Sequence, residues 1–183
     1  MFTQTSGTDT VAATSGGGGS LITDIVLVAA TVLTGLATGA LALYAHTIMP
    51  GLKKTDDRTF VGAFQQMDRA IINPWFMSTF FGALILIGVA GVMHFGADKR
   101  SLLPWLIAAF VLYLIAVILT VAINVPMNDA LKAAGDPAHI DVAKARADFN
   151  ESKWATWNYV RTFTSSAAFI ILTGVLLATK RGS

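Results

Sequence analysis

The 183-residue sequence contains no cysteine and few charged residues. The absence of cysteine excludes disulfide scaffolds, zinc–thiolate sites, iron–sulfur clusters and thiol nucleophiles. Charged residues make up 13% of the chain, against roughly 25% in a typical soluble domain, while hydrophobic residues make up 54%. This high apolar fraction excludes disorder for the bulk of the chain. The net charge of +2 comes from scattered basic residues, which provide no stripe for binding nucleic acid.

Four long uncharged stretches dominate the rest of the sequence. Each comes close to or exceeds the roughly 20 apolar residues that a helix needs to cross a bilayer. Lipid permits only helices or closed barrels, and these stretches lack the polar–apolar alternation of barrel strands. We therefore predict an all-α fold, a four-helix transmembrane bundle in the lipid bilayer. The expected membrane spans are residues 25–48, 74–95, 102–124 and 159–179.

The ends of the chain and its loops indicate its organisation. Residues 1–20 are polar, small and glycine-rich, so we expect a flexible tail before a single membrane domain at residues 21–183. Basic residues are densest in the short turn before the third span and in the C-terminal tail. By this density we expect both termini in the cytoplasm, at a bacterial plasma membrane, whereas the raw count of basic residues favours the two longer loops as the cytoplasmic side. The GxxxG spacing of Gly35 and Gly39 favours an intrachain helix contact over a homo-oligomer contact.

Residues that bind metals or cofactors are scarce. Glu151 is the only glutamate, so the Glu-x-x-His pairs of di-iron bundles are absent. His46 and His94 end the first and second spans on opposite membrane faces, about 30 Å apart, so one chain cannot place both on a single haem. P-loop, Rossmann and nucleophile-elbow motifs are also missing. We therefore expect no metal, no cofactor and no nucleic-acid partner.

A polar face precedes the fourth span. Four residues there are spaced i, i+3, i+4 and i+7, which places them on one side of a helix that begins near Glu151. They are Trp154, Trp157, Asn158 and Arg161. An interfacial belt would explain the two tryptophans, with the arginine reaching a lipid phosphate. It explains Asn158 poorly, and ionisable residues within a span mostly face the bundle interior, so we favour a functional pocket.

Both long loops contain amphipathic or polar segments. Asn124 and Asn128 lie four residues apart around Pro126, which removes a backbone hydrogen bond and kinks a helix. The two amides are either helix caps or one wall of a site. After the first span, residues 57–72 repeat apolar side chains at helical spacing. This pattern predicts an amphipathic helix that packs or anchors rather than one that lines a substrate site.

Four motifs in these segments point to a known family. They are Met49-Pro50, Phe64-Gln65-Gln66-Met67, Asn124-Val125-Pro126-Met127-Asn128 and Trp154-x-x-Trp157-Asn158-x-x-Arg161-Thr162. With this set of motifs, the chain resembles the anthrone oxygenase-like family of small four-helix membrane proteins, over about residues 21–180. The resemblance implies oxidation of polyketide anthrones to anthraquinones with O2 and without an obvious cofactor.

Such chemistry requires a base and a clamp for an oxyanion. We hypothesise that Arg161 and Asn158 hold the oxyanion and that His46 is the base, because histidine is the usual proton carrier near neutral pH. The predicted substrate-binding residues are Trp154, Trp157, Asn124, Asn128 and Gln66. The tryptophans would stack on planar rings, and the asparagines would position a peroxide or hydroxyl. The alternative is a non-catalytic protein that binds a lipid or quinone, or a structural subunit of a membrane complex.

Overall fold

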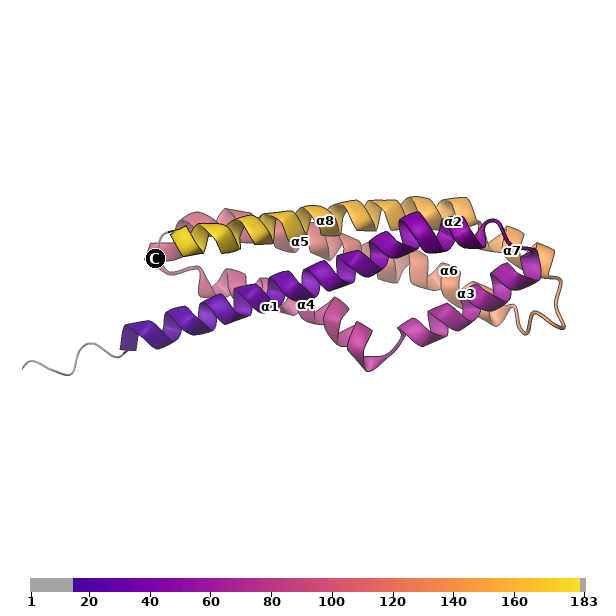
Figure 1. Ribbon diagram of the computed structural model, residues 1–183, viewed down its shortest axis with the longest axis horizontal. Helices are drawn as coiled ribbons and strands as arrows, with labels where there is room; N and C mark the ends of the chain where they lie inside the picture. The colour runs from indigo at the N-terminus through magenta and orange to yellow at the C-terminus, as the bar shows by residue number, and fades with distance from the viewer. Residues whose placement is uncertain (1–14, 182–183) are drawn as a thin grey trace, which may run out of the picture.

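The computed structural model describes residues 15–181, with side-chain surroundings described for residues 21–96 and 100–180. The regular structure in this part of the chain is helical. The α-helices are α1 (Ser15–Leu43), α2 (Met49–Leu52), α3 (Asp57–Ile71), α4 (Pro74–Met93), α5 (Leu103–Leu119), α6 (Val125–Ala133), α7 (Val142–Phe149) and α8 (Glu151–Arg181). Two π-helical segments and one 3-10 helix join some of them: η1 (Tyr44–Ile48), η3 (Thr120–Asn124) and η2 (Ala97–Leu102). Because η1 and η3 continue the helices before them, α1–η1–α2 and α5–η3–α6 are two long rods (Figure 1).

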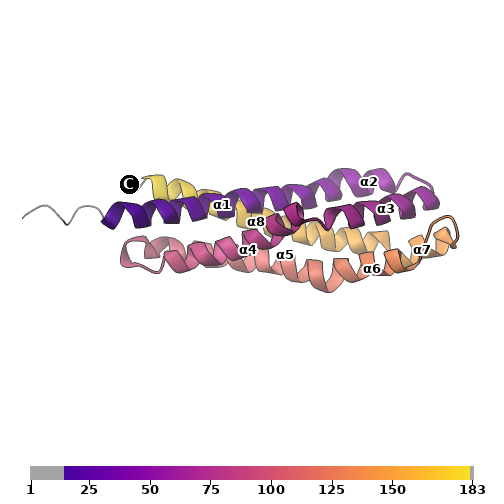
Figure 2. The same cartoon turned by 90° about the horizontal axis from the view of Figure 1, so that it is seen from below.

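The long helices form an antiparallel four-helix bundle (Figure 2). Helix α1 packs against α4 and α8, and α5 packs against the same two helices, so the four enclose one core. Four helical stretches are long and apolar enough to cross a membrane: Leu21–Leu52, Pro74–Met93, Arg100–Ala133 and Val142–Lys180. The expected all-α fold with four apolar spans is confirmed.

Two helices begin before the membrane spans expected for them. Helix α1 begins at Ser15, so residues 15–20, which we expected in the flexible tail, are helical; residues 1–14 lie outside the described part of the chain. A helix propagates more readily than it nucleates, so the apolar span extends its helix into this glycine-rich segment. Helix α8 begins at Glu151, as the spacing of its polar face predicts, and so starts well before the expected membrane span at residue 159. Its first turns are stabilised by packing within the chain, where Trp154 is buried.

Small and aliphatic side chains fill the transmembrane core. Tyr113 is fully buried there, and its hydroxyl donates a hydrogen bond to the backbone carbonyl of Phe80 at 3.0 Å, which satisfies a polar group where no water is present. A Cβ atom added at Gly35 would lie 2.8 Å from Cε2 of Phe169 in α8, whereas one at Gly39 would meet nothing within 4 Å. Gly35 therefore serves the intrachain contact that the GxxxG spacing predicts, and Gly39 does not.

A second apolar cluster lies beyond the transmembrane core, at the end of the bundle where α3, α6 and α7 meet (Figure 1). It includes Phe60 and Phe64 of α3, Phe149 of α7 and Trp154 of α8. The amphipathic helix predicted at residues 57–72 is α3, and its apolar stripe packs against α6 and α7. We call this group of helices the cap, since it covers one end of the bundle and positions α3 over it.

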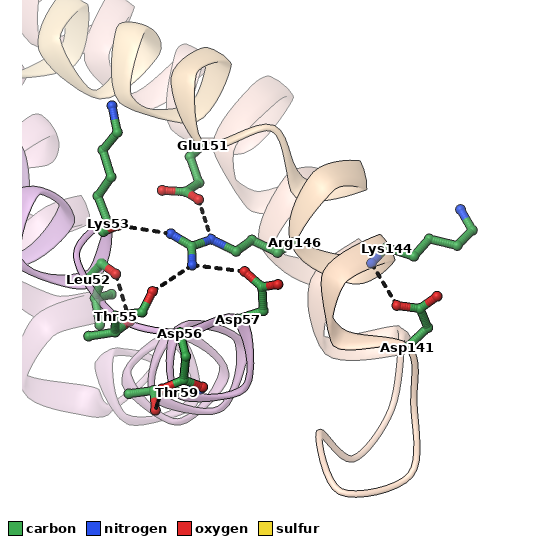
Figure 3. Close-up of polar contacts among 10 residues, drawn as sticks. All are labelled: Leu52, Lys53, Thr55, Asp56, Asp57, Thr59, Asp141, Lys144, Arg146 and Glu151. Atoms are coloured by element: carbon green, nitrogen blue, oxygen red, sulfur yellow. Dashed lines mark hydrogen bonds and ion pairs between the residues drawn. The ribbon is translucent and has the colours of Figure 1, made fainter.

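Arg146 of α7 ties the cap to the bundle (Figure 3). Its guanidinium donates hydrogen bonds to the carboxylates of Glu151 and Asp57, at 2.5 and 3.1 Å. It also donates to the backbone carbonyls of Lys53 and Thr55, at 3.2 and 2.8 Å. One side chain thus links the start of α8 to the loop before α3, which fixes where α3 leaves the first rod.

Side-chain caps define where α3 and α4 begin. The Asp56 carboxylate accepts hydrogen bonds from the hydroxyl of Thr59 at 2.6 Å and from its backbone N–H at 3.0 Å. These hydrogen bonds hold the pKa of the Asp56 carboxyl below its ordinary value. Asn73 accepts from the backbone N–H of Phe76 at 3.0 Å, as the Asn73-Pro74 pair predicts. The two caps thus fix the points at which the chain enters α3 and leaves it for α4.

Candidate functional site

A cavity of about 340 Å³ lies where the α3–α4 turn meets η3 and α8. This volume is within the range of small-molecule sites, about 300–1,000 Å³. The aromatic side chains in its wall are Tyr44, Phe64, Phe76, Phe80, Phe81 and Trp154. Its polar lining consists of Asp68, Thr120, Asn128, Asp129, Lys132, Asn158 and Arg161. The cavity therefore combines flat apolar walls with a small number of charged and amide groups.

The guanidinium of Arg161 is buried at this cavity, with the residue only 5% exposed. It donates hydrogen bonds to the Oδ1 of Asn158 at 2.8 Å and to the hydroxyl of Thr120 at 3.1 Å, and it lies 5.5 Å from the centre of the Trp154 ring. Among the described side chains it forms no ion pair, and its Nε–H has no hydrogen-bond partner. A buried positive charge with a free N–H is suited to bind an anion or a developing oxyanion.

Asn158 orients this guanidinium from one turn earlier in α8. Its Oδ1 accepts from Arg161, and its Nδ2 donates to the backbone carbonyl of Leu41 at 3.1 Å. The side chain is fully buried. The structure places Asn158, expected to donate to an oxyanion, in the cavity wall between α1 and the arginine, where it contacts the guanidinium.

The two π-helical segments both face the polar side of α8. Thr120, the first residue of η3, accepts from Arg161, and Asn124, its last, donates to the backbone carbonyl of Trp154 at 3.3 Å. The hydroxyl of Tyr159, also in α8, donates to the carbonyl of Ala45 in η1 at 3.2 Å. Such π-helical turns are rare and occur frequently at functional sites. Their position here coincides with the cavity.

A second polar cluster centres on Asp68 of α3. Its Oδ1 accepts from Asn128 Nδ2 at 2.6 Å, and its Oδ2 pairs with Lys132 Nζ at 2.6 Å. Asn128 in turn accepts from the indole N–H of Trp154 at 2.7 Å, and Lys132 also pairs with the exposed Asp129 at 2.9 Å. These contacts fix the carboxylate at the cavity wall. Neither this cluster nor any other group of described side chains gathers three His, Cys, Asp or Glu residues around a metal position.

The structure brings half of the predicted site residues to the cavity. Trp154, Asn158, Arg161 and Asn128 line it. Asn124 is buried behind the wall, where it contacts the backbone of α8 instead. The amides around Pro126 thus form a site wall at Asn128 and a helix-to-helix contact at Asn124.

Three predicted residues lie away from the cavity. His46 and Gln66 are exposed, and Trp157 is half-buried; none of the three lines it. The helical registers explain this result. In η1 the residue that faces the cavity is Tyr44, and in α3 the cavity face carries Phe64, Asp68 and Ile71. His46 and Gln66 lie off these faces. In α8 the cavity face follows the spacing i, i+4 and i+7, which leaves Trp157 at its edge.

The sequence pattern had not singled out Asp68, Lys132, Tyr44 or Thr120 as site residues. Asp68 follows Phe64 by four residues, so it lies on the same face of α3 as that core phenylalanine. Lys132 follows Asn128 by the same spacing in α6. Asp68 and Lys132 could both have been identified as site residues by one signal: each is a charged residue on the same helix face as buried or cavity-lining residues. No local signal identified Tyr44 or Thr120, because the π-helical turns determine where they face.

Comparison with known proteins identifies a family for this chain. The model of the family described as anthrone oxygenase matches residues 75–171, more than half of the chain. The matched segment runs from α4 into α8 and contains Asn128, Asn158 and Arg161. No curated protein and no solved structure matches the chain. On the extent of the family match, the chain belongs to the anthrone oxygenase family.

Proposed function

We propose that the protein oxidises a planar anthrone to the corresponding anthraquinone with O2. The observation that carries the proposal is the guanidinium of Arg161, which is buried in an aromatic cavity without a counterion. An anthrone is flat and largely apolar, and loss of its methylene proton places negative charge on its carbonyl oxygen. Such a ligand matches both the walls of the cavity and its unpaired positive charge. Membership of the anthrone oxygenase family supports the same chemistry.

The first step is removal of a proton from the methylene carbon. The C–H bond breaks, its electron pair delocalises onto the carbonyl oxygen, and the proton passes to a base. Arg161 stabilises the oxyanion through its charge and the Nη N–H bonds not already used by Asn158 and Thr120, in a site largely shielded from water. Asn158 acts as a positioning residue, since its Nδ2 donates to the Leu41 carbonyl of α1 while its Oδ1 accepts from the guanidinium.

We assign the base to Asp68 rather than to His46, which is exposed and outside the cavity. The described lining residues include two carboxylates, of which the Asp68 side chain is 8% exposed and the Asp129 side chain 60%. A carboxylate can deprotonate a carbon acid when an oxyanion site stabilises the product, as in ketosteroid isomerase. Asn128 and Lys132 hold the Asp68 carboxylate in place for this transfer.

The electron-rich carbanion then reacts with O2. A C–O bond forms, and the proton held by Asp68 passes to the outer oxygen, which gives a hydroperoxide. Loss of the remaining methylene proton and of hydroxide turns the carbon into the second carbonyl, and the two leave as water. The sum is one anthrone and one O2 to one anthraquinone and one water, so no further reductant or oxidant is required.

O2 uptake by protein reconstituted in liposomes tests the proposal. A panel of anthrones would be added, and anthraquinone would be followed by its absorbance. We expect O2 loss and anthraquinone gain in equal amounts, above the rate in protein-free liposomes. Binding of anthraquinone without any O2 uptake would overturn the proposal and would favour a quinone-binding protein instead.

A matched pair of variants tests the assigned base. Asp68→Asn keeps the shape of the side chain but removes its basicity, so it should lower kcat by about 10²–10⁴-fold. Asp129→Asn removes the exposed partner of the same lysine, and a surface ion pair contributes little, so its effect should stay near about threefold. Equal kcat values for the two variants would exclude Asp68 as the base.

A further inference from the structure

The cavity opens on one side, and the rim of this opening is mostly apolar. Among the lining residues, Ile72, Phe81, Val121 and Val125 are exposed apolar side chains. Phe81 belongs to α4, Val121 to η3 and Val125 to α6, while Ile72 lies in the α3–α4 turn. The opening therefore lies between α4 and the η3–α6 part of the long rod. We call these four residues the rim.

The helix arrangement explains why the bundle is open at this point. Helix α4 packs against α1 and α5, and the described residues give it no comparable interface with η3 or α6. Figure 1 shows the turn between α3 and α4 standing away from the other helices. The first half of α4 thus diverges from the rod opposite it, and the cavity occupies the space between them.

The depth of the rim determines what faces it. Helix α4 has 20 residues, about 30 Å at 1.5 Å per residue, which matches the hydrocarbon thickness of a bilayer. Phe81 comes seven residues after Pro74, so it lies about 10 Å into this layer. Val121 and Val125 lie within the third candidate span. Phe81 and the rod residues across the opening from it therefore lie at the depth of acyl chains, whereas Asp68 lies in α3, which precedes the start of α4.

We propose that the ligand reaches the cavity laterally from the bilayer, through the opening between α4 and the η3–α6 rod. The proposal rests on the proposed function, in that the ligand is a planar aromatic ketone, which partitions into lipid. Such a molecule slides between Phe81 and Val121 with its flat face against the aromatic wall. Its oxygen then meets the guanidinium of Arg161, the buried unpaired charge of the cavity.

Bulky substitutions at the rim test this route in full-length protein reconstituted in phosphatidylcholine vesicles. The probe is 9,10-anthraquinone dissolved in the same vesicles, which binds but has no methylene group to oxidise. Temperature-jump relaxation of tryptophan fluorescence measures its association rate without any turnover. Val121→Trp narrows the opening, and Phe81→Ala widens it. Ile118→Trp is the matched control, because Ile118 is exposed on the same rod but does not line the cavity.

We expect Val121→Trp to slow association by about tenfold or more and Ile118→Trp to change it by less than about twofold. Phe81→Ala should speed association. The lateral route is overturned if Val121→Trp and Phe81→Ala both leave the rate unchanged, or if Ile118→Trp slows it as much as Val121→Trp. The probe cannot be oxidised, so its binding does not depend on the proposed function. If the rim substitutions change its association rate but anthrones cause no O2 uptake, the proposed function is refuted and the lateral route stands.

Discussion

Replacing Arg161 with methionine should abolish anthrone oxidation while leaving the fold intact. Methionine keeps a long unbranched side chain but removes the charge, the two hydrogen bonds to Asn158 and Thr120, and the contact with the Trp154 ring. Removing one donor from an oxyanion site typically lowers kcat by about 10²–10³-fold. We expect a loss of at least this size, because the arginine supplies the free Nη N–H bonds and the only positive charge we assign to the oxyanion.

The effect of Arg161→Met on stability should be small, because large contributions oppose each other. Two hydrogen bonds from a charged group contribute about 1.5–3 kcal/mol each, and a desolvated cation–π contact about 2 kcal/mol. Against these stands the cost of burying a guanidinium without a counterion, which is several kcal/mol. The free energy of unfolding should therefore change by no more than about 2 kcal/mol in either direction.

The loss of activity is measured from initial rates of anthrone-dependent O2 uptake, in liposomes that contain equal amounts of each variant. The change in stability is measured by thermal denaturation of each variant in the same detergent. Arg58→Met is the matched control, because Arg58 is an exposed arginine outside the cavity. Arg161→Lys keeps a charge but not the planar fork, and should retain about a tenth of the activity. Full activity of Arg161→Met, at matched protein levels, would refute the role of the guanidinium.

Two further predictions concern packing and capping. Gly35→Ala should destabilise the bundle by about 1–3 kcal/mol, whereas Gly39→Ala has open space and should not; equal melting temperatures would contradict this. The lowered pKa of Asp56 means that its carboxylate stabilises α3 above its ordinary pKa and that this contribution is lost as the pH falls through the lowered value. The protection factors of the amides at the start of α3, which correct for the pH dependence of intrinsic exchange, should therefore fall below about pH 4, and Asp56→Asn should remove this dependence.

The fold was predictable because it depends on properties that the sequence displays directly. Uncharged stretches of the length of a bilayer allow few alternatives to helices, and Asn73 with Pro74 marks a helix start at the observed residue. The start of α8 near Glu151 followed from the spacing of its polar face, but the packing around its first turns did not. Its first turns are covered by α3 and α7, and no local pattern specifies that these loop helices fold back against it.

The site was predictable only where its residues share one helix. Trp154, Asn158 and Arg161 belong to α8, so spacing alone placed them on a common face. Asp68 reaches them only because the cap folds α3 over the bundle, which is a tertiary effect. The prediction for His46 rested on the proton chemistry of histidine, which does not say where the side chain points, and the structure places it exposed in a π-helical turn. A local pattern cannot anticipate either a long-range contact or a change of helical register.

The π-helical turn η3 has a consequence for how this protein could evolve. The backbone N–H of Val125 bonds to the carbonyl of Thr120, so this turn contains one more residue than an α-helical turn. Deleting a single codon here would leave an ordinary α-helical turn, so the later side chains of the rod would keep their facing. Asn128 and Lys132 would still reach Asp68, whereas Thr120 and Asn124, which lie inside the turn, would not both keep their contacts with α8. One small deletion could thus change the surroundings of Arg161 in a lineage whose protein still inserts and folds normally.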